Sequence, residues 1–298
     1  MSPLESAPLT APTKAADRLA AFLTHGPALV LTGAGMSTDS GIPDYRGPDG
    51  LRRVTPMQHG EFVGSLGARQ RYWARSFIGW ERFTAATPND GHRAVAQLQD
   101  RRLLGPVITQ NVDGLHQRAG SRDVIELHGS LARVACLDCG FEVDRDVLQA
   151  RMARANPGFA DRAVGKAADG SQVSSQIRPD GDVVLADDAI EHFVLPVCEV
   201  CAADTLKPDV VFFGGSVPPE RVAECMALTE AAPSLLVLGS SLAVMSGLRF
   251  VRRAAARGIP IAIVTHRATR GDDLASLRLD VSLTPTLVAL LRSVAGWP

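Results

Sequence analysis

Residues 28–47 read ALVLTGAGMSTDSGIPDYRG, a short apolar run followed by a glycine-rich polar segment. The run at residues 28–31 has no alternation of polar and apolar residues, which is typical of a strand buried on both faces of a sheet. Glycines at positions 33 and 35 would let a phosphate group reach backbone amides and the dipole of a following helix. Thr38 stands where G-x-G-x-x-G has its third glycine, so an ordinary turn remains the alternative for this loop taken by itself.

Four more short apolar runs follow along the chain, at residues 106–108, 210–213, 235–238 and 259–264. They are rich in Val, Ile and Leu, and helix-like stretches such as 92–99 and 248–257 lie between them. We therefore predict an α/β fold: a Rossmann-like parallel sheet with helices on both faces. Polar segments follow the runs, and the carboxyl ends of parallel strands share one edge. We expect the segments TQNVDGLH, FGGS, GSSLAVMS and THRATR to meet the glycine loop in one cleft.

The composition is that of an ordinary globular protein, with 298 residues, 46% hydrophobic and 21% charged residues and a net charge of -1. A chain so close to neutral is not expected to bind nucleic acid. No apolar stretch reaches the roughly 20 residues needed to cross a bilayer, and the N-terminus lacks a signal core, so we expect a cytoplasmic protein without membrane contact. We expect the proline-rich start to be a loose tail before a first helix at residues 17–23.

Two C-x-x-C pairs, Cys136 with Cys139 and Cys198 with Cys201, are separated by a long insert. Four thiolates fill the tetrahedral shell of zinc and leave no position for water, which predicts one structural zinc ion in a small domain. Two disulfides or a redox pair remain the alternative. The insert contains a helix-like stretch at 144–155 and then a polar stretch at 161–182, part of which we expect to be mobile.

Three segments resemble the sirtuin family: GAGMSTDSGIPDYRG at 33–47, QNVDGLH at 110–116 and ELHGS at 126–130. The first differs from the sirtuin pattern G-A-G-x-S-x-x-S-G-I-P-D-F-R-G only in having Tyr45 for Phe. Segments 70–75, 206–214 and 269–274 resemble the class II, sirtuin four-like branch. The resemblance covers roughly residues 29–283. It implies an enzyme that uses NAD to remove acyl groups from lysine side chains of protein substrates, releasing nicotinamide.

The resemblance also implies which residues contact NAD. The loop Gly33, Ala34 and Gly35 would line the pyrophosphate site. Asp44 and Arg46 would orient NAD, with the Tyr45 ring over the reactive ribose. The remaining expected contacts are Ser37, Pro43, Gln110, Val112, Gly239, Ser240, Ser241, Thr265, His266, Arg267 and Leu283. Two departures from the family pattern, Thr265 for Asn and Gly215 for an acid, could alter affinity without touching the chemistry.

Three residues are expected to carry the reaction. By the resemblance, Asn111 and Asp113 bind nicotinamide and its ribose, and His128 is the general base. A carboxylate suits the positive charge that develops on the ribose as nicotinamide leaves. An imidazole suits the removal of a proton from a ribose hydroxyl. A structural role is the alternative for His128, and it is the interpretation we favour for His25, His59, His92 and His192. We expect His116 to act through structure or hydrogen bonding.

The substrate is expected to add a strand to the edge formed by residues 210–214, with residues 242–244 on its other side. The candidate substrate contacts are Tyr72, Arg75, Val211, Phe212, Phe213 and Gly214. Tyr72 and Arg75 are one helical turn apart, which suggests that an arginine near the acyl channel favours polar or acidic acyl groups over acetyl. A solvated arginine beside a packed aromatic ring is the alternative.

These expectations divide the chain into two domains. Residues 1–133 and 203–298 would form the NAD-binding domain, with the cofactor loop and a helical insert at about 43–90. Residues 134–202 would form the zinc-binding domain. We expect a monomer. The alternative functions are transfer of ADP-ribose to a protein, an NAD-sensing module without catalysis, and, remotely, a zinc-ribbon nucleic-acid binder.

Overall fold

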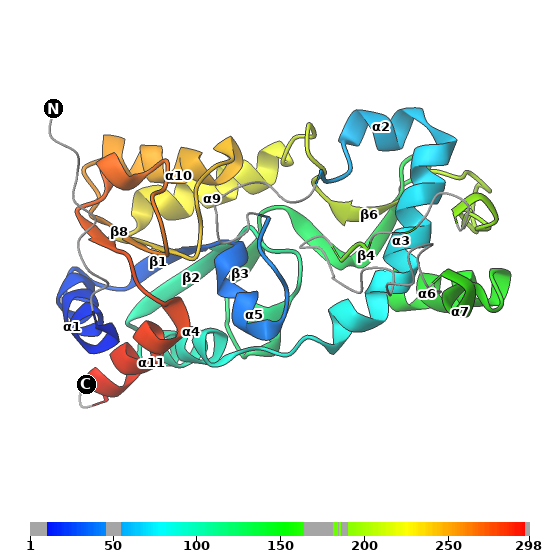
Figure 1. The fold of residues 1–298 in the computed structure, drawn as a ribbon. Coiled ribbons are helices and arrows are strands. Elements are labelled where there is room, and N and C mark those ends of the chain that lie inside the picture. Colours follow the sequence, from blue (N-terminus) through cyan, green and yellow to red (C-terminus); the bar gives the residue numbers. More distant parts are fainter. Residues whose placement is uncertain (1–10, 46–54, 164–180, 184, 186–189, 296–298) are drawn as a thin grey trace, which may run out of the picture.

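The computed structural model of the chain describes residues 11–45, 55–163, 181–183, 185 and 190–295. Within them lie one parallel sheet and one antiparallel sheet, at opposite ends of an elongated molecule (Figure 1). The predicted mobile segment within 161–182 falls almost entirely outside the described residues, and Arg46 does so as well.

The parallel sheet has six strands in the order β3-β2-β1-β7-β8-β9. Its strands are β1 (Ala28–Thr32), β2 (Leu104–Thr109), β3 (Val124–Glu126), β7 (Leu235–Leu238), β8 (Ile261–Val264) and β9 (Leu277–Leu279). Four of the five apolar runs lie in its central strands, so the predicted parallel sheet is confirmed. The chain builds the sheet outward from β1 on one side and from β7 on the other. The strand order therefore reverses between β1 and β7, where ligands bind in such sheets.

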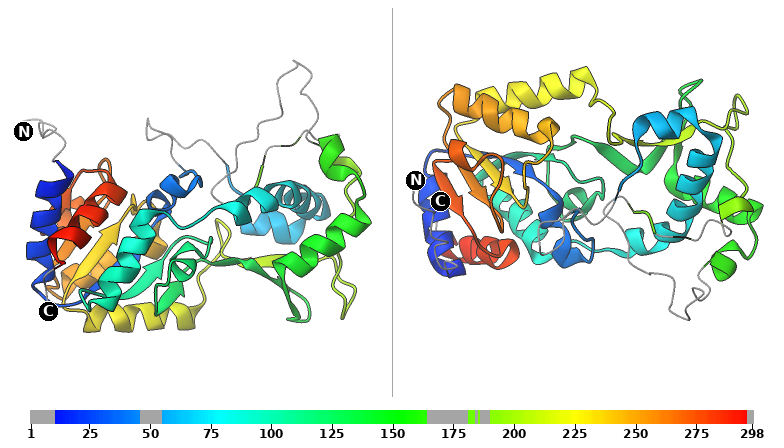
Figure 2. Two further views of the ribbon diagram at one scale, coloured as in Figure 1. Left: turned by 90° about the horizontal axis from the view of Figure 1, so that it is seen from below. Right: turned by 45° about the horizontal axis from the view of Figure 1, so that its top comes forward.

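Helices cover both faces of this sheet. One face carries α1 (Pro12–Leu23), α4 (Asp90–Asp100) and α11 (Leu283–Ser293), and the other carries α9 (Pro219–Ala231) and α10 (Met245–Ala256). Figure 2 shows the blue α1 and the red α11 next to each other on one face. Neighbouring residues of a strand pack into opposite layers: Val30 joins the first helical layer, and Leu29 and Leu31 join the second. Both layers are apolar, which is why the strands show no alternation.

The predicted helices at 92–99, 144–155 and 248–257 are present, but the predicted start of the first helix was wrong. Helix α1 begins at Pro12 rather than near Asp17. Proline fits the first turn because its missing N–H would have no intrahelical partner there and its φ angle suits a helix. The segment that was interpreted as a tail therefore already belongs to the helix from Pro12 onward.

The apolar run at 210–213 was predicted as a strand of the parallel sheet, and this prediction was wrong. Strand β6 (Leu206–Val210) pairs antiparallel with β4 (Gly129–Cys136), which also pairs with β5 (Glu142–Asp144). The residues beyond β6 bury aromatic rings instead: Phe212 packs edge-on against Phe62 and Tyr72. A four-residue apolar run has no periodicity that could distinguish these two environments.

Helices pack around the antiparallel sheet and form a second apolar core. They are α2 (His59–Gly64), α3 (Leu66–Ala85), α6 (Arg145–Ala155) and α7 (Phe159–Ala163). Arg145 on α6 is 1% exposed, and its guanidinium lies 5.3 Å from the Trp73 ring centroid and 4.6 Å from that of Trp80. It also donates to the carbonyl oxygen of Ser76. This buried cation fixes α6 against α3, the helix that carries Tyr72.

None of the helices in the described ranges is both long enough and apolar enough to span a bilayer. The predicted domain boundaries stay a prediction.

Two buried histidines, His92 on α4 and His116 on α5 (Leu115–Arg118), have ring centroids 4.9 Å apart. The Nδ1 of His92 accepts from the backbone of Asn89 in a capping box, and Nε2 of His116 lies 3.1 Å from Oγ1 of Thr32. These contacts agree with the structural roles expected from the sequence. Burial lowers the pKa of His92 to about 4 and that of His116 to about 3.

Acid should therefore destabilise the fold through these two residues. Because their folded-state pKa values lie below the unfolded value of about 6.5, their contribution is complete above that pH and is lost as pH falls toward 4 and 3. Between pH 7 and pH 5 we expect a loss of about 2 kcal/mol per histidine, measured by urea unfolding. The variant His116→Gln should lose less stability over this pH range than wild type. An equal loss in both proteins would contradict this assignment.

Candidate active site

A cavity of about 1310 Å³ lies at the carboxyl ends of the strands and extends toward the antiparallel sheet. It is bounded by the loops that follow β1, β2, β7 and β8 and by the segment that follows β6. The predicted convergence of polar segments on one cleft thus takes place, although the FGGS segment reaches it from the second sheet.

The loops after β1 and β7 approach each other so closely that side chains are excluded. A Cβ atom on Gly35 would lie 2.8 Å from the carbonyl oxygen of Gly239, and the Gly35 N–H donates to that same oxygen. Gly239 has a φ of +61°, and a Cβ there would lie 2.6 Å from the backbone nitrogen of Met36. Only glycine fits both positions. The backbone of the glycine loop is therefore open to the cavity.

One expectation about this loop was wrong. Within the described residues 33–45, β1 is followed not by a long helix but by two three-residue 3-10 turns, η1 (Ala34–Met36) and η2 (Thr38–Ser40). Such short turns carry little aligned dipole. An anion at Gly33–Gly35 would thus gain little from a helix dipole, and the N–H groups of Gly33 and Gly35 already donate to the carbonyl oxygens of Leu238 and Gly239.

A polar cluster joins the loops after β1 and β2. Ser37 donates to Asp113 at 2.6 Å, and Asn111 Nδ2 donates to the carbonyl oxygen of Gly33 at 3.1 Å and to Oγ of Ser37 at 3.0 Å. The backbone N–H of Leu115 donates to the second carboxylate oxygen of Asp113. Burial raises the pKa of Asp113, and the hydrogen bond from Ser37 opposes this shift. The carboxylate is thus held in one orientation at the cavity wall.

His128 lies between the two sheets, directly before β4. Its Nδ1 is 2.9 Å from the carbonyl oxygen of Gln110, and its Nε2 is 2.8 Å from Oγ of Ser246. Burial lowers the pKa of His128, the contact with Gln110 opposes this, and Arg221 adds to it. A neutral imidazole at neutral pH is the form that can accept a proton.

The segment after β6 is attached to the same histidine through its backbone. Val211 donates its N–H to the carbonyl oxygen of His128 at 2.8 Å. Next to it, Gly129 has a φ of +82° and approaches the carbonyl oxygen of Asp209 so closely that a Cβ would lie 1.9 Å away. Phe213 accepts a backbone hydrogen bond from His59 and packs against Tyr45. The predicted substrate edge and the predicted base therefore share one backbone junction.

The four cysteines lie at two turns of the small sheet, and their sulfur atoms lie within 4.8 Å of one another. The Sγ atoms of Cys136 and Cys201 are 3.6 Å apart, and those of Cys139 and Cys198 are 3.7 Å apart. Tetrahedral zinc with Zn–S bonds of about 2.3 Å requires sulfur separations of about 3.8 Å, whereas a disulfide bond measures about 2.05 Å. This donor set fits a zinc ion and does not fit the disulfide alternative. The fifth cysteine, Cys225, is buried in α9 and lies outside this cluster.

Nearly all predicted site residues line the cavity. They are Gly33, Ala34, Gly35, Ser37, Pro43, Asp44, Tyr45, Tyr72, Gln110, Asn111, Val112, Asp113, His128, Val211, Phe212, Phe213, Gly214, Gly239, Ser240, Ser241, Thr265, His266, Arg267 and Leu283. Arg75 is the exception within the described residues: it is half-buried on α3 and does not line the cavity.

Sequence reasoning missed several residues of the cavity wall, including Thr38, Leu131, Ser246, Arg249 and Arg270. Ser246 lies within the quoted segment GSSLAVMS, so its position after a buried strand was the signal that could have found it. Leu131 and Arg249 carry no comparable signal. They reach the cavity only through the packing of β4 and α10.

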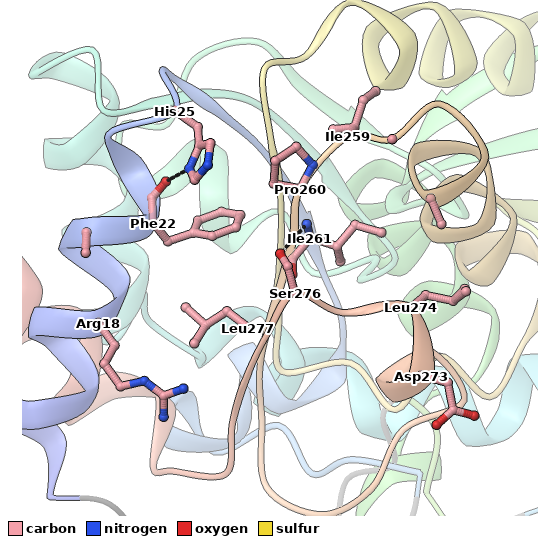
Figure 3. A pocket seen from close by; sticks show the side chains of 13 residues that line it. Arg18, Phe22, His25, Ile259, Pro260, Ile261, Asp273, Leu274, Ser276 and Leu277 are labelled. Atoms are coloured by element: carbon pink, nitrogen blue, oxygen red, sulfur yellow. Dashed lines mark hydrogen bonds between the residues drawn. The ribbon is translucent and has the colours of Figure 1, made fainter.

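A second hollow lies at the opposite end of the parallel sheet, between α1, the start of β8 and the turn before β9 (Figure 3). Its wall includes Arg18, His25, Asp273 and Ser276. The ring of His25 turns back to the carbonyl oxygen of Phe22, and Ser276 bonds the backbone of Ile261. These two side chains are thus used to hold the local backbone, in agreement with the structural role expected for His25.

Known proteins match this chain over a range that includes most of the cavity residues. The Sir2 family model matches residues 33–246. A protein of Streptomyces coelicolor named NAD-dependent protein deacetylase 1 is 54% identical over 269 residues, which cover 90% of this chain and 86% of that protein. A protein of Monosiga brevicollis named NAD-dependent protein deacylase SIR4 is 46% identical over 280 residues, covering 93% of this chain and 88% of that protein.

Solved structures agree with these matches. A structure described as "Sir2-p53 peptide-NAD+" has a TM-score of 0.70 and 27% identity, covering 93% of this chain and 98% of that one. Another, described as Sir2Tm bound to a propionylated peptide, has a TM-score of 0.71 and 26% identity, covering 94% and 98%. The resemblance inferred from residues 33–47, 110–116 and 126–130 is confirmed, and the chain belongs to the Sir2 family, the sirtuins.

Proposed function

We propose that this protein is an NAD-dependent protein lysine deacylase. The observation that carries the proposal is that the glycine loop, the carboxylate of Asp113 and the imidazole of His128 line one cavity at the point where the strand order reverses. Relatives at 54% and 46% identity bear the names of NAD-dependent deacetylase and deacylase. A solved relative is described with both a peptide and NAD.

The residues around the cavity fit NAD. The backbone of Gly33–Gly35, which lines the cavity, would hold the pyrophosphate, and Thr265, His266 and Leu283 line the part of the cavity beyond β8. Asn111 and Asp113 would orient the nicotinamide and its ribose. When bound, NAD supplies the ribose carbon that receives the acyl oxygen as nicotinamide leaves. A carboxylate held by Ser37 is already oriented to stabilise positive charge on that ribose.

His128 would act after nicotinamide has left. A carbonyl oxygen can only accept a hydrogen bond, so the contact with Gln110 places the proton of the neutral ring on Nδ1. Nε2 then carries the lone pair and lies at the cavity wall, 2.8 Å from the hydroxyl of Ser246. From there it would take the proton of a ribose hydroxyl and activate that oxygen as a nucleophile.

We propose acylated-lysine proteins as the partners, bound along residues 210–214. Phe212, Tyr72 and Leu131 give the cavity an apolar wall beside this segment, whereas Arg75 does not reach it. This arrangement favours neutral acyl groups such as acetyl over acidic ones. A monomeric state and a cytoplasmic location stay predictions from the sequence.

The decisive experiment separates nicotinamide release from acyl transfer. With an acetyl-lysine peptide and NAD, wild type should release nicotinamide and form deacylated peptide. His128→Ala should still bind NAD and exchange labelled nicotinamide, while deacylation should fall by about 10²–10⁴-fold. Mass spectrometry of the products and a nicotinamide-exchange assay measure the two steps.

The matched control is His25→Ala, at the exposed histidine of the opposite hollow, which should deacylate like wild type. Nicotinamide release that yields ADP-ribosylated protein instead of deacylated peptide would favour ADP-ribose transfer. NAD binding without nicotinamide release on any acyl peptide would favour a sensing module.

Acyl preference tests the role of Tyr72 and Arg75. Because Arg75 does not line the cavity, Arg75→Ala should leave the ratio of rates on acetyl and succinyl peptides within about twofold of wild type. Competition between the two peptides, followed by mass spectrometry, gives this ratio directly. A strong succinyl preference that disappears in Arg75→Ala would restore the acidic-acyl hypothesis.

Zinc removal tests the cysteine cluster. Purified protein should contain one zinc ion per chain, and chelation should lower its thermal midpoint and its activity together, because a structural zinc ion stabilises the fold without touching the substrate. Cys139→Ser should lose the ion, whereas Cys225→Ala, at the buried cysteine outside the cluster, should retain it. Elemental analysis measures the stoichiometry. Full zinc content in Cys139→Ser would refute the assignment of the four ligands.

A further inference from the structure

The hydrogen-bond partners of His128 determine which of its two ring nitrogens carries the proton. Nδ1 carries the proton because Gln110 offers only a carbonyl oxygen, at 2.9 Å. Nε2 of the neutral ring therefore has a lone pair and no proton, so the hydroxyl of Ser246, 2.8 Å away, must be the donor. Ser246 thus holds the nitrogen that the proposed reaction uses as a base.

Ser246 is held in place by the start of a helix. It is the second residue of α10, which begins at Met245, seven residues after the end of β7 at Leu238. The next residue, Gly247, lies against the side chain of Gln110, where a Cβ would be 2.6 Å from Oε1. Gln110 in turn donates to the carbonyl oxygen of Thr32 and to Ser240. Gln110 and Ser246, the two hydrogen-bond partners of the imidazole, are therefore packed against each other at one part of the cavity wall.

The surroundings of His128 oppose a positive charge on the ring. Arg221, on α9, donates to the carbonyl oxygen of the adjacent Leu127 at 3.4 Å. The N-terminal end of α10, which carries partial positive charge, lies next to the ring, because Ser246 is the second residue of that helix. An imidazolium formed here needs a nearby acceptor for its new N–H. The hydroxyl of Ser246 is such an acceptor at hydrogen-bond distance.

We propose that Ser246 is a positioning residue for His128 in both protonation states, a role that rests on the proposed function. In the free enzyme its hydroxyl donates to the one lone pair of Nε2 and fixes the orientation of the ring. For the reaction the serine O–H turns away, which frees that lone pair for the ribose hydroxyl. During acyl transfer the O–H bond of the ribose breaks, its electron pair stays on the oxygen, and the proton forms the Nε2–H bond. The serine hydroxyl then rotates and accepts from Nε2–H, keeping its own proton throughout.

This role affects one step of the reaction. Nicotinamide release depends on Asn111 and Asp113, which do not contact Ser246 through any hydrogen bond among the described residues. Ser246→Ala should therefore slow deacylation roughly tenfold, the effect of one lost hydrogen bond at the base. Its nicotinamide-exchange rate and its KM for NAD should stay within about twofold of wild type. Ser246→Thr keeps a hydroxyl and should recover most of the deacylation rate.

A spectroscopic measurement on the free enzyme tests the contact without turnover. In protein labelled with ¹⁵N-histidine, the ring nitrogens of His128, assigned by their absence in His128→Ala, should show Nδ1 protonated in wild type. In Ser246→Ala the Nε2 signal should move toward that of a nitrogen without a hydrogen-bond donor, and in Ser246→Thr it should not.

The outcomes separate this proposal from the proposed function. Unchanged deacylation in Ser246→Ala, or an equal fall in nicotinamide exchange and deacylation, would overturn the positioning role. An Nε2 signal that is the same in wild type and Ser246→Ala would overturn it as well. If wild type releases no nicotinamide on any acyl peptide, the proposed function fails. The shift of Nε2 in Ser246→Ala would then still report whether the hydrogen bond exists.

Discussion

The close contact between the loops after β1 and β7 is the constraint on which the rest of the site depends. Gly35 donates to the carbonyl oxygen of Gly239, and neither position has room for a Cβ atom. This contact lies where the strand order reverses, so it determines where the exposed backbone of residues 33–35 faces the cavity. The carboxylate of Asp113 and the amide of Asn111 are placed relative to that backbone through Ser37 and Gly33. A side chain at either glycine would separate these groups.

The second sheet matters because it brings the proposed substrate edge to the same point. His128 precedes β4 and accepts the N–H of Val211, which follows β6, so the proposed base and the proposed substrate edge share a backbone hydrogen bond. Gly129 allows this junction because it adopts a left-handed conformation directly against Asp209. At the far end of the same two strands, the cysteines are spaced as tetrahedral zinc requires. The metal site can thus stabilise the substrate edge from a distance without taking part in the chemistry.

Most of the fold could be predicted, and nearly all of the predicted NAD and substrate contacts line the cavity, for different reasons. The strands at 28–31, 106–108, 235–238 and 259–264 were recognisable because burial on both faces requires continuous apolar residues. The cavity residues were recognisable because glycine, asparagine, aspartate and histidine occur in long segments that resemble a family. The errors came from short segments. The run at 210–213 has too few residues to show a period, and a proline at position 12 suits a helix start as well as a tail.

The sequence by itself determined the family, the residue types of the chemistry and the four cysteine ligands, because each of these depends on local composition and spacing along the chain. Only the tertiary structure decided that residues 210–213 follow the end of a strand in a separate antiparallel sheet, that Arg75 does not line the cavity and that Ser246 lies at hydrogen-bond distance from Nε2 of His128. His128 and Ser246 are 118 positions apart. Such a contact forms because the start of α10 and the start of β4 lie side by side at the cavity wall. The spacing of residues along the chain does not reveal this arrangement.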